Sequence, residues 1–234
     1  NQRSIVDGTW NVLEAVRRHA PAARVFLSGS ALQFQNTGSA VDESAPFVAT
    51  SAYSAQRIAS VYAARYFRSE HQIHAYIGYF FHHDSPLRES YHVAHKVATA
   101  VRRIQAGSTE VLKMGSLDVW KEWTYAGDAV EAAWLLVNQD RHHEIVIGSG
   151  VPHSIQQWVE ECFRLAGLNW SKHVFEERGF RPEYPMLYSN PARLRSLGWQ
   201  PQVSFTELAR IMIGARADEY GAAFFSGRQG APSC

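Results

Sequence analysis

The sequence contains only two cysteines, Cys162 and Cys234, too few for the disulfide framework of a small secreted domain. Its apolar runs are short and interrupted by charged residues, so none reaches the roughly 20 residues that a membrane-spanning helix needs. No signal-peptide pattern follows Asn1. An excess of one charge is missing as well, because 23 basic residues are balanced by 22 acidic ones. We therefore expect a cytoplasmic protein with no membrane partner and no nucleic-acid partner.

A glycine-rich turn is missing where a dinucleotide-binding domain would carry one. Such a domain opens with a strand, a Gly-rich turn and a helix whose amino end receives the pyrophosphate. This chain opens on a helical pattern instead. The pair Gly148 and Gly150 follows a late strand and lacks a third glycine, so we interpret it as a loop. The phosphates of a dinucleotide would therefore have to be held by residues outside this chain.

The pattern that is present alternates helices with strands. Helical periodicity covers residues 8–18, about 50–69, 93–106, 128–137 and 155–166, and Thr50 or Ser51 can cap the second of these helices. Four apolar stretches are typical of buried strands, namely "ARVFLSGS", "IHAYIGYFF", "VLKMG" and "EIVIGSG". This alternation with tight connections predicts an α/β fold with a right-handed parallel sheet. The polar tail from 226 to 234 is expected to be disordered.

Several strings of the sequence resemble the extended short-chain dehydrogenase/reductases, and among them the GDP-mannose 4,6-dehydratases. The resemblance extends from about Asp7 to Tyr220 and is carried by "GTWNVLEAVR", "SGSALQF", "DESAPFVATSAYSAQR", "FFHHDSPLRE", "HVAHK" and "GSLDVWKEWTYAGDAVEAAW". It implies a doubly wound Rossmann-type sheet, whose first units with the Gly-rich turn are missing here, and a smaller α/β substrate lobe toward the C-terminus.

The resemblance also implies a division of labour along the chain. Residues 1–84 would be the remaining part of the dinucleotide-binding domain, and 85–225 the substrate-binding lobe, with about 117–137 crossing back. The implied cofactor is NADP or NAD. The implied substrate is a nucleotide sugar, with a GDP-sugar favoured, and the implied assembly is a homo-oligomer.

The resemblance places oxidation chemistry on Tyr53, Ser30 and Arg57. Oxidising a sugar hydroxyl requires a base at the oxygen while hydride leaves the carbon, and a tyrosine can serve when a neighbouring cation favours its phenolate. Tyr53 and Arg57 are four residues apart at a predicted helix start, so they share one helix face. Arg57 stands in place of the family's lysine, which keeps the charge but replaces a compact ammonium with a planar fork. Ser30 matches the hydroxyl that bonds the substrate oxygen.

Other matched positions concern ligand contacts. The resemblance implies that Ser28 and His82, together with Tyr53 and Arg57, contact the cofactor; His82 replaces an asparagine of the family. It assigns substrate contacts to His83, Lys96, Lys121 and Arg181. Neighbouring side chains in an extended segment point to opposite sides, so we predict no metal site at His82 and His83.

One substitution removes a chemical group. Leu32 stands where the family has the glutamate that acts in the elimination step, and a leucine cannot transfer a proton. General acid/base groups of this kind contribute roughly 10²- to 10⁴-fold to rate. Two hypotheses therefore remain: a nucleotide-sugar enzyme that acts at C4, with or without dehydration, or a catalytically inactive relative that serves as a scaffold or partner subunit. In the second, Tyr53 packs and Arg57 is a surface residue or a phosphate ligand.

Overall fold

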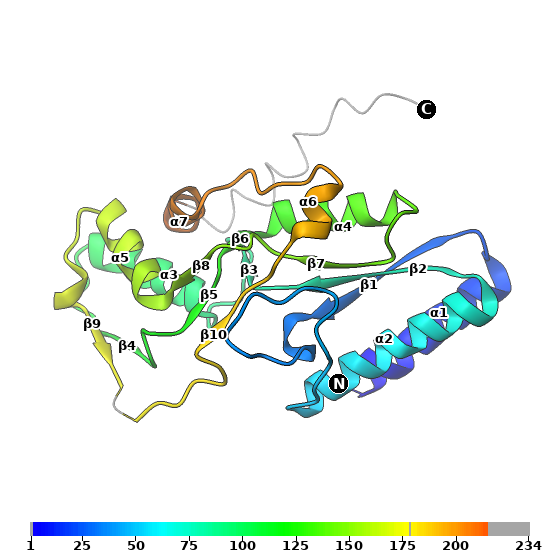
Figure 1. Cartoon of the computed structure of the whole chain (residues 1–234). Coiled ribbons are helices and arrows are strands. Elements are labelled where there is room, and N and C mark those ends of the chain that lie inside the picture. Colours follow the sequence, from blue (N-terminus) through cyan, green and yellow to red (C-terminus); the bar gives the residue numbers. More distant parts are fainter. Residues whose placement is uncertain (1, 178, 215–234) are drawn as a thin grey trace. The chain divides into compact units, whose positions relative to one another are not determined.

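The computed structural model describes residues 2–177 and 179–214 (Figure 1). The tail expected to be disordered, 226–234, lies outside the described residues. The chain forms two compact units, each described by itself below. Among the described residues, the first unit comprises 2–83, 120–152 and 184–202, and the second comprises 84–119, 153–177, 179–183 and 203–214.

The centre of the first unit is a three-stranded parallel sheet in the order β1 (Arg24–Ser30), β2 (His74–Phe80) and β7 (Glu144–Ile147). Ser30 lies opposite Phe80, and Phe80 lies opposite Ile147, so the carboxyl ends of the three strands are level. Strands β2 and β7 are rich in fully buried apolar residues, as expected for a sheet that is covered on both faces, whereas β1 is only partly buried. The predicted parallel α/β sheet is confirmed.

Helices cover the two faces of this sheet (Figure 1). A π-helical turn η1 (Arg3–Asp7), α1 (Gly8–His19) and α2 (Ala52–His71) lie on one face, and α4 (Ala126–Val137) and α6 (Ala192–Ser196) lie on the other. Leu13, Val61 and Phe67 belong to the apolar core beneath α1 and α2. Leu136 and Leu194 belong to the core on the opposite face.

Helix α2 begins where the sequence predicted. The Ser51 hydroxyl accepts a hydrogen bond from the backbone N–H of Ser54 (3.1 Å), and the Ser54 hydroxyl lies 2.9 Å from the backbone nitrogen of Ser51, which donates to it. These reciprocal bonds satisfy backbone donors that a helix start leaves open. The helix ends at Gln72, which adopts a left-handed conformation with φ of 56°. Tyr53 and Arg57 are thereby fixed in the first two turns of α2.

Short elements complete the first unit. They are a 3-10 turn η2 (Ala31–Gln33), β5 (Trp120–Glu122), β6 (Thr124–Tyr125) and β10 (Met186–Leu187). Strands β5 and β10 pair in parallel, with Lys121 opposite Leu187. Two further short strands, β3 (His83–Asp84) and β8 (Pro152–Ser154), lie where the chain passes between the units.

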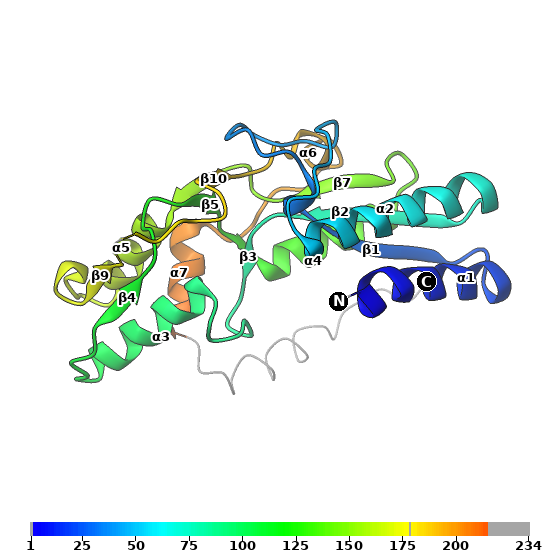
Figure 2. The ribbon, with the colours of Figure 1, turned by 90° about the horizontal axis from the view of Figure 1, so that it is seen from below.

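The second unit is built on three helices, α3 (Val93–Gln105), α5 (Ile155–Leu165) and α7 (Phe205–Gly214), which pack against one another (Figure 2). A parallel pair, β4 (Leu112–Met114) and β9 (Val174–Glu176), and a 3-10 turn η3 (Trp170–Lys172) complete it. Among the helices that the structure describes, none combines the length and the apolar character needed to cross a bilayer.

The units differ in extent from the division that the resemblance implied. Residues 138–152 and 184–202 belong to the first unit, whereas the sequence analysis assigned them to the lobe. The physical reason is that β7 extends the sheet beside β2, and α6 packs on β7. Which ligand each unit binds remains a prediction.

Candidate active site

The structure brings Tyr53, Arg57 and Ser28 together. Arg57 Nε donates to the phenol oxygen of Tyr53 (3.2 Å), and the guanidinium carbon lies 5.3 Å from the centroid of the Tyr53 ring. Arg57 Nη1 donates to both the carbonyl oxygen (2.7 Å) and the hydroxyl oxygen (2.9 Å) of Ser28. The prediction that Tyr53 and Arg57 share one helix face is confirmed, and the guanidinium ties the phenol to the end of β1.

Ser30 is the last residue of β1, two positions beyond Ser28. Residues two apart in a strand point to the same side, so the two hydroxyls share one side of β1. Gly29, between them, faces Tyr79 on β2: a Cβ at Gly29 would lie 2.4 Å from Tyr79 Cδ1. The Ser30 hydroxyl accepts a bond from the Leu32 backbone N–H (3.3 Å) and caps η2. Its own O–H remains a donor that could point to a substrate oxygen.

Leu32 packs partly buried against the apolar core beneath α1 and α2. Its side chain therefore contributes to packing at the position where the resemblance places an acid/base group. Gln33, beside it, is fully buried, and its side-chain oxygen accepts from the backbone N–H of Ser30 (2.6 Å). Neither side chain can donate or remove a proton in an elimination.

His82 and Lys121 meet at Trp123. The His82 ring packs edge-on against the Trp123 indole, with ring centroids 5.1 Å apart. Lys121 Nζ lies 5.4 Å from the centroid of the Trp123 ring, a cation–π distance, and the residue is only 9% exposed. The two predicted ligand contacts therefore form one group around a buried indole, in the first unit.

The remaining predicted contacts are dispersed. His83 is turned back toward the end of β2, since its ring packs on Phe80 at 5.1 Å and its Nδ1 lies 2.9 Å from the Phe81 carbonyl oxygen. Lys96 and Arg181 are exposed residues of the second unit. Lys96 Nζ donates to the backbone carbonyl of Lys113. Over residues 2–177 and 179–214, the structure contains no group of three His, Cys, Asp or Glu side chains that could hold a metal ion.

Glu122 is an ionisable group that the sequence analysis did not single out. It is fully buried on β5 and accepts hydrogen bonds from the Ser189 backbone N–H, the Ser189 hydroxyl (2.6 Å) and the Ser149 backbone N–H (2.6 Å). Burial raises the pKa of Glu122, which the bonds from Ser189 and Ser149 oppose. The carboxylate holds the loop that follows β7, at the carboxyl edge of the sheet. Its position between Trp120 and Trp123 was the only local signal of burial.

The family model described as GDP-mannose 4,6 dehydratase matches residues 2–212 of the chain. The chain belongs to the GDP-mannose 4,6-dehydratase family. It is 32% identical over 216 residues to GDP-mannose 4,6 dehydratase 1 of Arabidopsis thaliana, an alignment that covers 89% of this chain and 60% of the plant protein. It is 30% identical over 229 residues to GDP-mannose 4,6-dehydratase of Sinorhizobium fredii, covering 88% of this chain and 65% of the bacterial protein.

The chain thus spans about 60% of the length of the curated relatives that it matches. Solved structures of low sequence identity share its fold. RMD from Pseudomonas aeruginosa complexed with NADPH superposes with a TM-score of 0.84 at 18% identity, covering 91% of this chain and 73% of that one. dTDP-glucose 4,6-dehydratase from Bacillus anthracis in complex with NAD superposes with a TM-score of 0.82 at 15% identity, covering 95% of this chain and 70% of the other. The predicted Rossmann-type α/β fold is therefore confirmed for this family member.

Proposed function

We propose that this chain is the greater part of a nucleotide-sugar-modifying enzyme that transfers hydride at sugar C4 with NADP. The observation that carries the proposal is the bonded group of Tyr53, Arg57 and Ser28 where β1 ends and α2 begins. Membership of the GDP-mannose 4,6-dehydratase family supports a nucleotide sugar, and a GDP-sugar in particular, as the substrate class.

Tyr53 would act as the base that removes the proton from the sugar hydroxyl. Arg57 Nε already donates to its phenol oxygen, and a permanent cation at that distance stabilises negative charge on the oxygen. Ser30, with one O–H to donate, would hold the sugar oxygen during the transfer. Arg57 cannot take part in proton exchange at neutral pH, because a guanidinium stays charged.

The residues present fit the nicotinamide end of the cofactor. A guanidinium carries five N–H donors, and the bonds of Arg57 to Tyr53 and Ser28 use the donor on Nε and those on Nη1. Within the described part of the chain Nη2 makes no hydrogen bond, so it can donate to a ribose hydroxyl. Ser28 and His82 are the further candidate contacts. The bound nicotinamide would supply the hydride acceptor.

Dehydration by the route of the family is not part of the proposal, because Leu32 packs in the core where a proton-transferring group is required. For the substrate, Lys96 and Arg181 offer exposed cations that suit a diphosphate. Lys121 is buried against Trp123 and His83 is turned back on β2, so a role in substrate binding requires either side chain to rearrange.

A second candidate function is a catalytically inactive relative that acts as a scaffold or partner subunit. It is favoured by the bonds of Arg57 Nη1 to both oxygens of Ser28, since they show that the guanidinium has protein partners of its own at the end of β1. In that case the Tyr53 and Arg57 pair serves only to fasten α2 to β1.

NADP titration separates the two candidates. A ligand at a hundred times its Kd adds about 2.7 kcal/mol to the free energy of unfolding, and about 5–11 °C to the Tm of a protein of this size. The enzyme proposal expects this protection, and faster NADPH formation from a GDP-sugar when Arg57→Lys restores the ammonium. A Tyr53→Phe variant should bind NADP but form no NADPH. Absence of protection by NADP, NAD and GDP-sugar alike would favour the scaffold when it is measured on the full-length protein, which includes the residues that hold the dinucleotide phosphates.

The proposed homo-oligomer has a candidate surface on α1 and α2. Trp10, Val12, Tyr62 and Tyr66 are each more than 40% exposed, and the Trp10 and Tyr66 rings lie 5.8 Å apart. Exposed aromatic side chains gathered on two adjacent helices suit a self-complementary interface. Sedimentation should show an oligomer that Tyr62→Glu dissociates, while Val111→Glu, at an exposed residue of the second unit, leaves it intact.

A further inference from the structure

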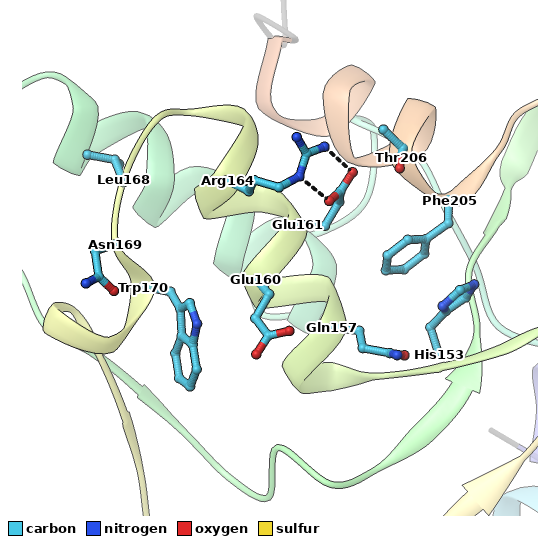
Figure 3. A pocket seen from close by; sticks show the side chains of 10 residues that line it. All are labelled: His153, Gln157, Glu160, Glu161, Arg164, Leu168, Asn169, Trp170, Phe205 and Thr206. Carbon is cyan, nitrogen blue, oxygen red and sulfur yellow. Dashed lines mark hydrogen bonds and ion pairs between the residues drawn. The ribbon is translucent and has the colours of Figure 1, made fainter.

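The second unit contains a cavity of about 680 Å³ that shares no residue with the group at Tyr53 (Figure 3). This is a size typical of small-molecule sites. Its lining comes from α5, η3, α7 and the segments that flank them: His153, Gln157, Glu160, Glu161, Arg164, Leu168, Asn169, Trp170, Phe205 and Thr206. No step of the proposed hydride transfer uses this cavity.

One side of α5 forms the floor. Gln157, Glu160, Glu161 and Arg164 follow the i, i+3, i+4, i+7 spacing of a single helix face. The opposite face of α5 carries fully buried apolar residues and anchors the helix in the unit. Ser154 and Gln157 fix its start through a capping box. The polar stripe is therefore held in place by the packing behind it.

Aromatic rings stand on either side of this floor. The His153 and Phe205 rings are stacked, with centroids 4.0 Å apart and 15° between their planes. Trp170 lies across from them on η3, where Asn169 accepts bonds from the Ser171 backbone N–H (3.1 Å) and hydroxyl (2.9 Å). Figure 3 shows Glu160 between Trp170 and Gln157. The Trp170 indole thus projects from a turn that the hydrogen bonds of Asn169 stabilise.

The charge of the lining is negative. Arg164 donates two hydrogen bonds of 2.8 Å to Glu161, so the charges of these two side chains neutralise one another. The bonds lower the pKa of Glu161 to about 2. Burial lowers the pKa of His153, so its ring is neutral at pH 7. Glu160 accepts a bond from Gln156 Nε2 (2.8 Å) and makes no ion pair within the described residues. One uncompensated carboxylate remains, beside an indole.

We propose that this cavity binds a small organic cation, an ammonium group joined to a flat apolar body. The ammonium would pair with Glu160 and lie against Trp170, and the apolar body would extend toward the stacked His153 and Phe205. A phosphate-bearing ligand does not suit the lining, because its only cationic side chain, Arg164, is already bound to Glu161. Ordered walls favour the binding of a small ligand, since few side chains need to be immobilised.

Calorimetry on the full chain tests the proposal with three matched probes: 2-phenylethylamine, the neutral 2-phenylethanol and the anionic phenylacetate. We expect the amine to bind with a Kd that is roughly millimolar, and the other two to bind at least threefold more weakly. Glu160→Gln should raise the Kd of the amine by about threefold or more and leave the Kd of 2-phenylethanol unchanged. Glu177→Gln, an exposed glutamate of the same unit that does not line the cavity, should leave the amine unchanged.

Trp170→Leu is the second test. It should raise the Kd of the amine, while the Tm of the variant shows that the chain still folds. If that variant unfolds, Glu160→Gln decides alone, because the substitution is isosteric and Glu160 is not fully buried. Equal binding of the amine and the alcohol, preference for phenylacetate, or an unchanged amine Kd in Glu160→Gln would each overturn the proposal. None of these outcomes depends on hydride transfer at Tyr53.

Discussion

Replacing Glu144 with glutamine tests how the sheet is fastened to α2. The Glu144 carboxylate, at the start of β7, accepts from Arg65 Nε (2.9 Å) and Nη2 (2.6 Å), from Arg68 Nη2 (2.6 Å) and from the Tyr79 hydroxyl (2.7 Å). Its side chain is 13% exposed. Glutamine keeps the shape but turns one acceptor oxygen into a donor, so an arginine loses its partner.

The magnitude follows from the pKa of the carboxyl group. Burial raises the pKa of Glu144, but the bonds from Arg65, Arg68 and Tyr79 outweigh burial and lower it from 4.5 to about 2. At 1.36 kcal/mol per pKa unit, this difference corresponds to about 3 kcal/mol of stability. That agrees with the roughly 3–5 kcal/mol lost when one partner of a buried ion pair is removed. The Tm should fall by about 6–12 °C.

Thermal unfolding between pH 7 and pH 2.5 is the assay. Because the folded pKa is depressed, the contribution is fully present above pH 4.5 and is lost as the pH falls toward about 2. The gap in Tm between wild type and Glu144→Gln should therefore narrow below pH 4.5. Glu14→Gln is the control: its pKa is also about 2 through Arg17 and Arg18, but it lies on the solvent side of α1, where screening makes the effect small. A gap that is constant with pH, or equal for Glu14→Gln, would refute the reasoning.

Two further predictions concern close packing in the first unit. Gly29→Ala should lower the free energy of unfolding in urea by about 1–3 kcal/mol, because its Cβ would lie 2.4 Å from the Tyr79 ring, whereas Gly8→Ala, whose nearest neighbour would be 3.5 Å away, should not. Glu122→Gln should cost about 1–3 kcal/mol, since an amide N–H would face the donors of Ser189 and Ser149. An unchanged urea midpoint in Gly29→Ala or in Glu122→Gln would contradict the packing described here.

Local sequence signals predicted the elements of the fold and the Tyr53 and Arg57 contact well. Capping by Ser51, the apolar strand runs and the four-residue spacing act within one or two helical turns, so the sequence displays them directly. The Glu144 cluster could not be found in this way, because Arg65 and Arg68 are 79 and 76 residues away and meet it only when the sheet forms. Glu122 and its bonds to residues 149 and 189 share that limit, as does the cavity on α5.

Stability and chemistry are separable at the start of α2. The helix is held by the Ser51 and Ser54 cap and by apolar residues in later turns, whereas Arg57 contributes only half-exposed bonds to Tyr53 and Ser28. Bonds of this kind are each worth about 1 kcal/mol net. Because a lysine ammonium can replace part of them, Arg57→Lys should cost about 1–2 kcal/mol and lower the Tm of the chain without cofactor by roughly 2–8 °C. If Arg57 only holds α2 to β1, Arg57→Lys can weaken that contact but cannot increase the rate of NADPH formation. A small loss of Tm joined to a gain in hydride transfer would therefore identify position 57 as part of the chemistry rather than the fold.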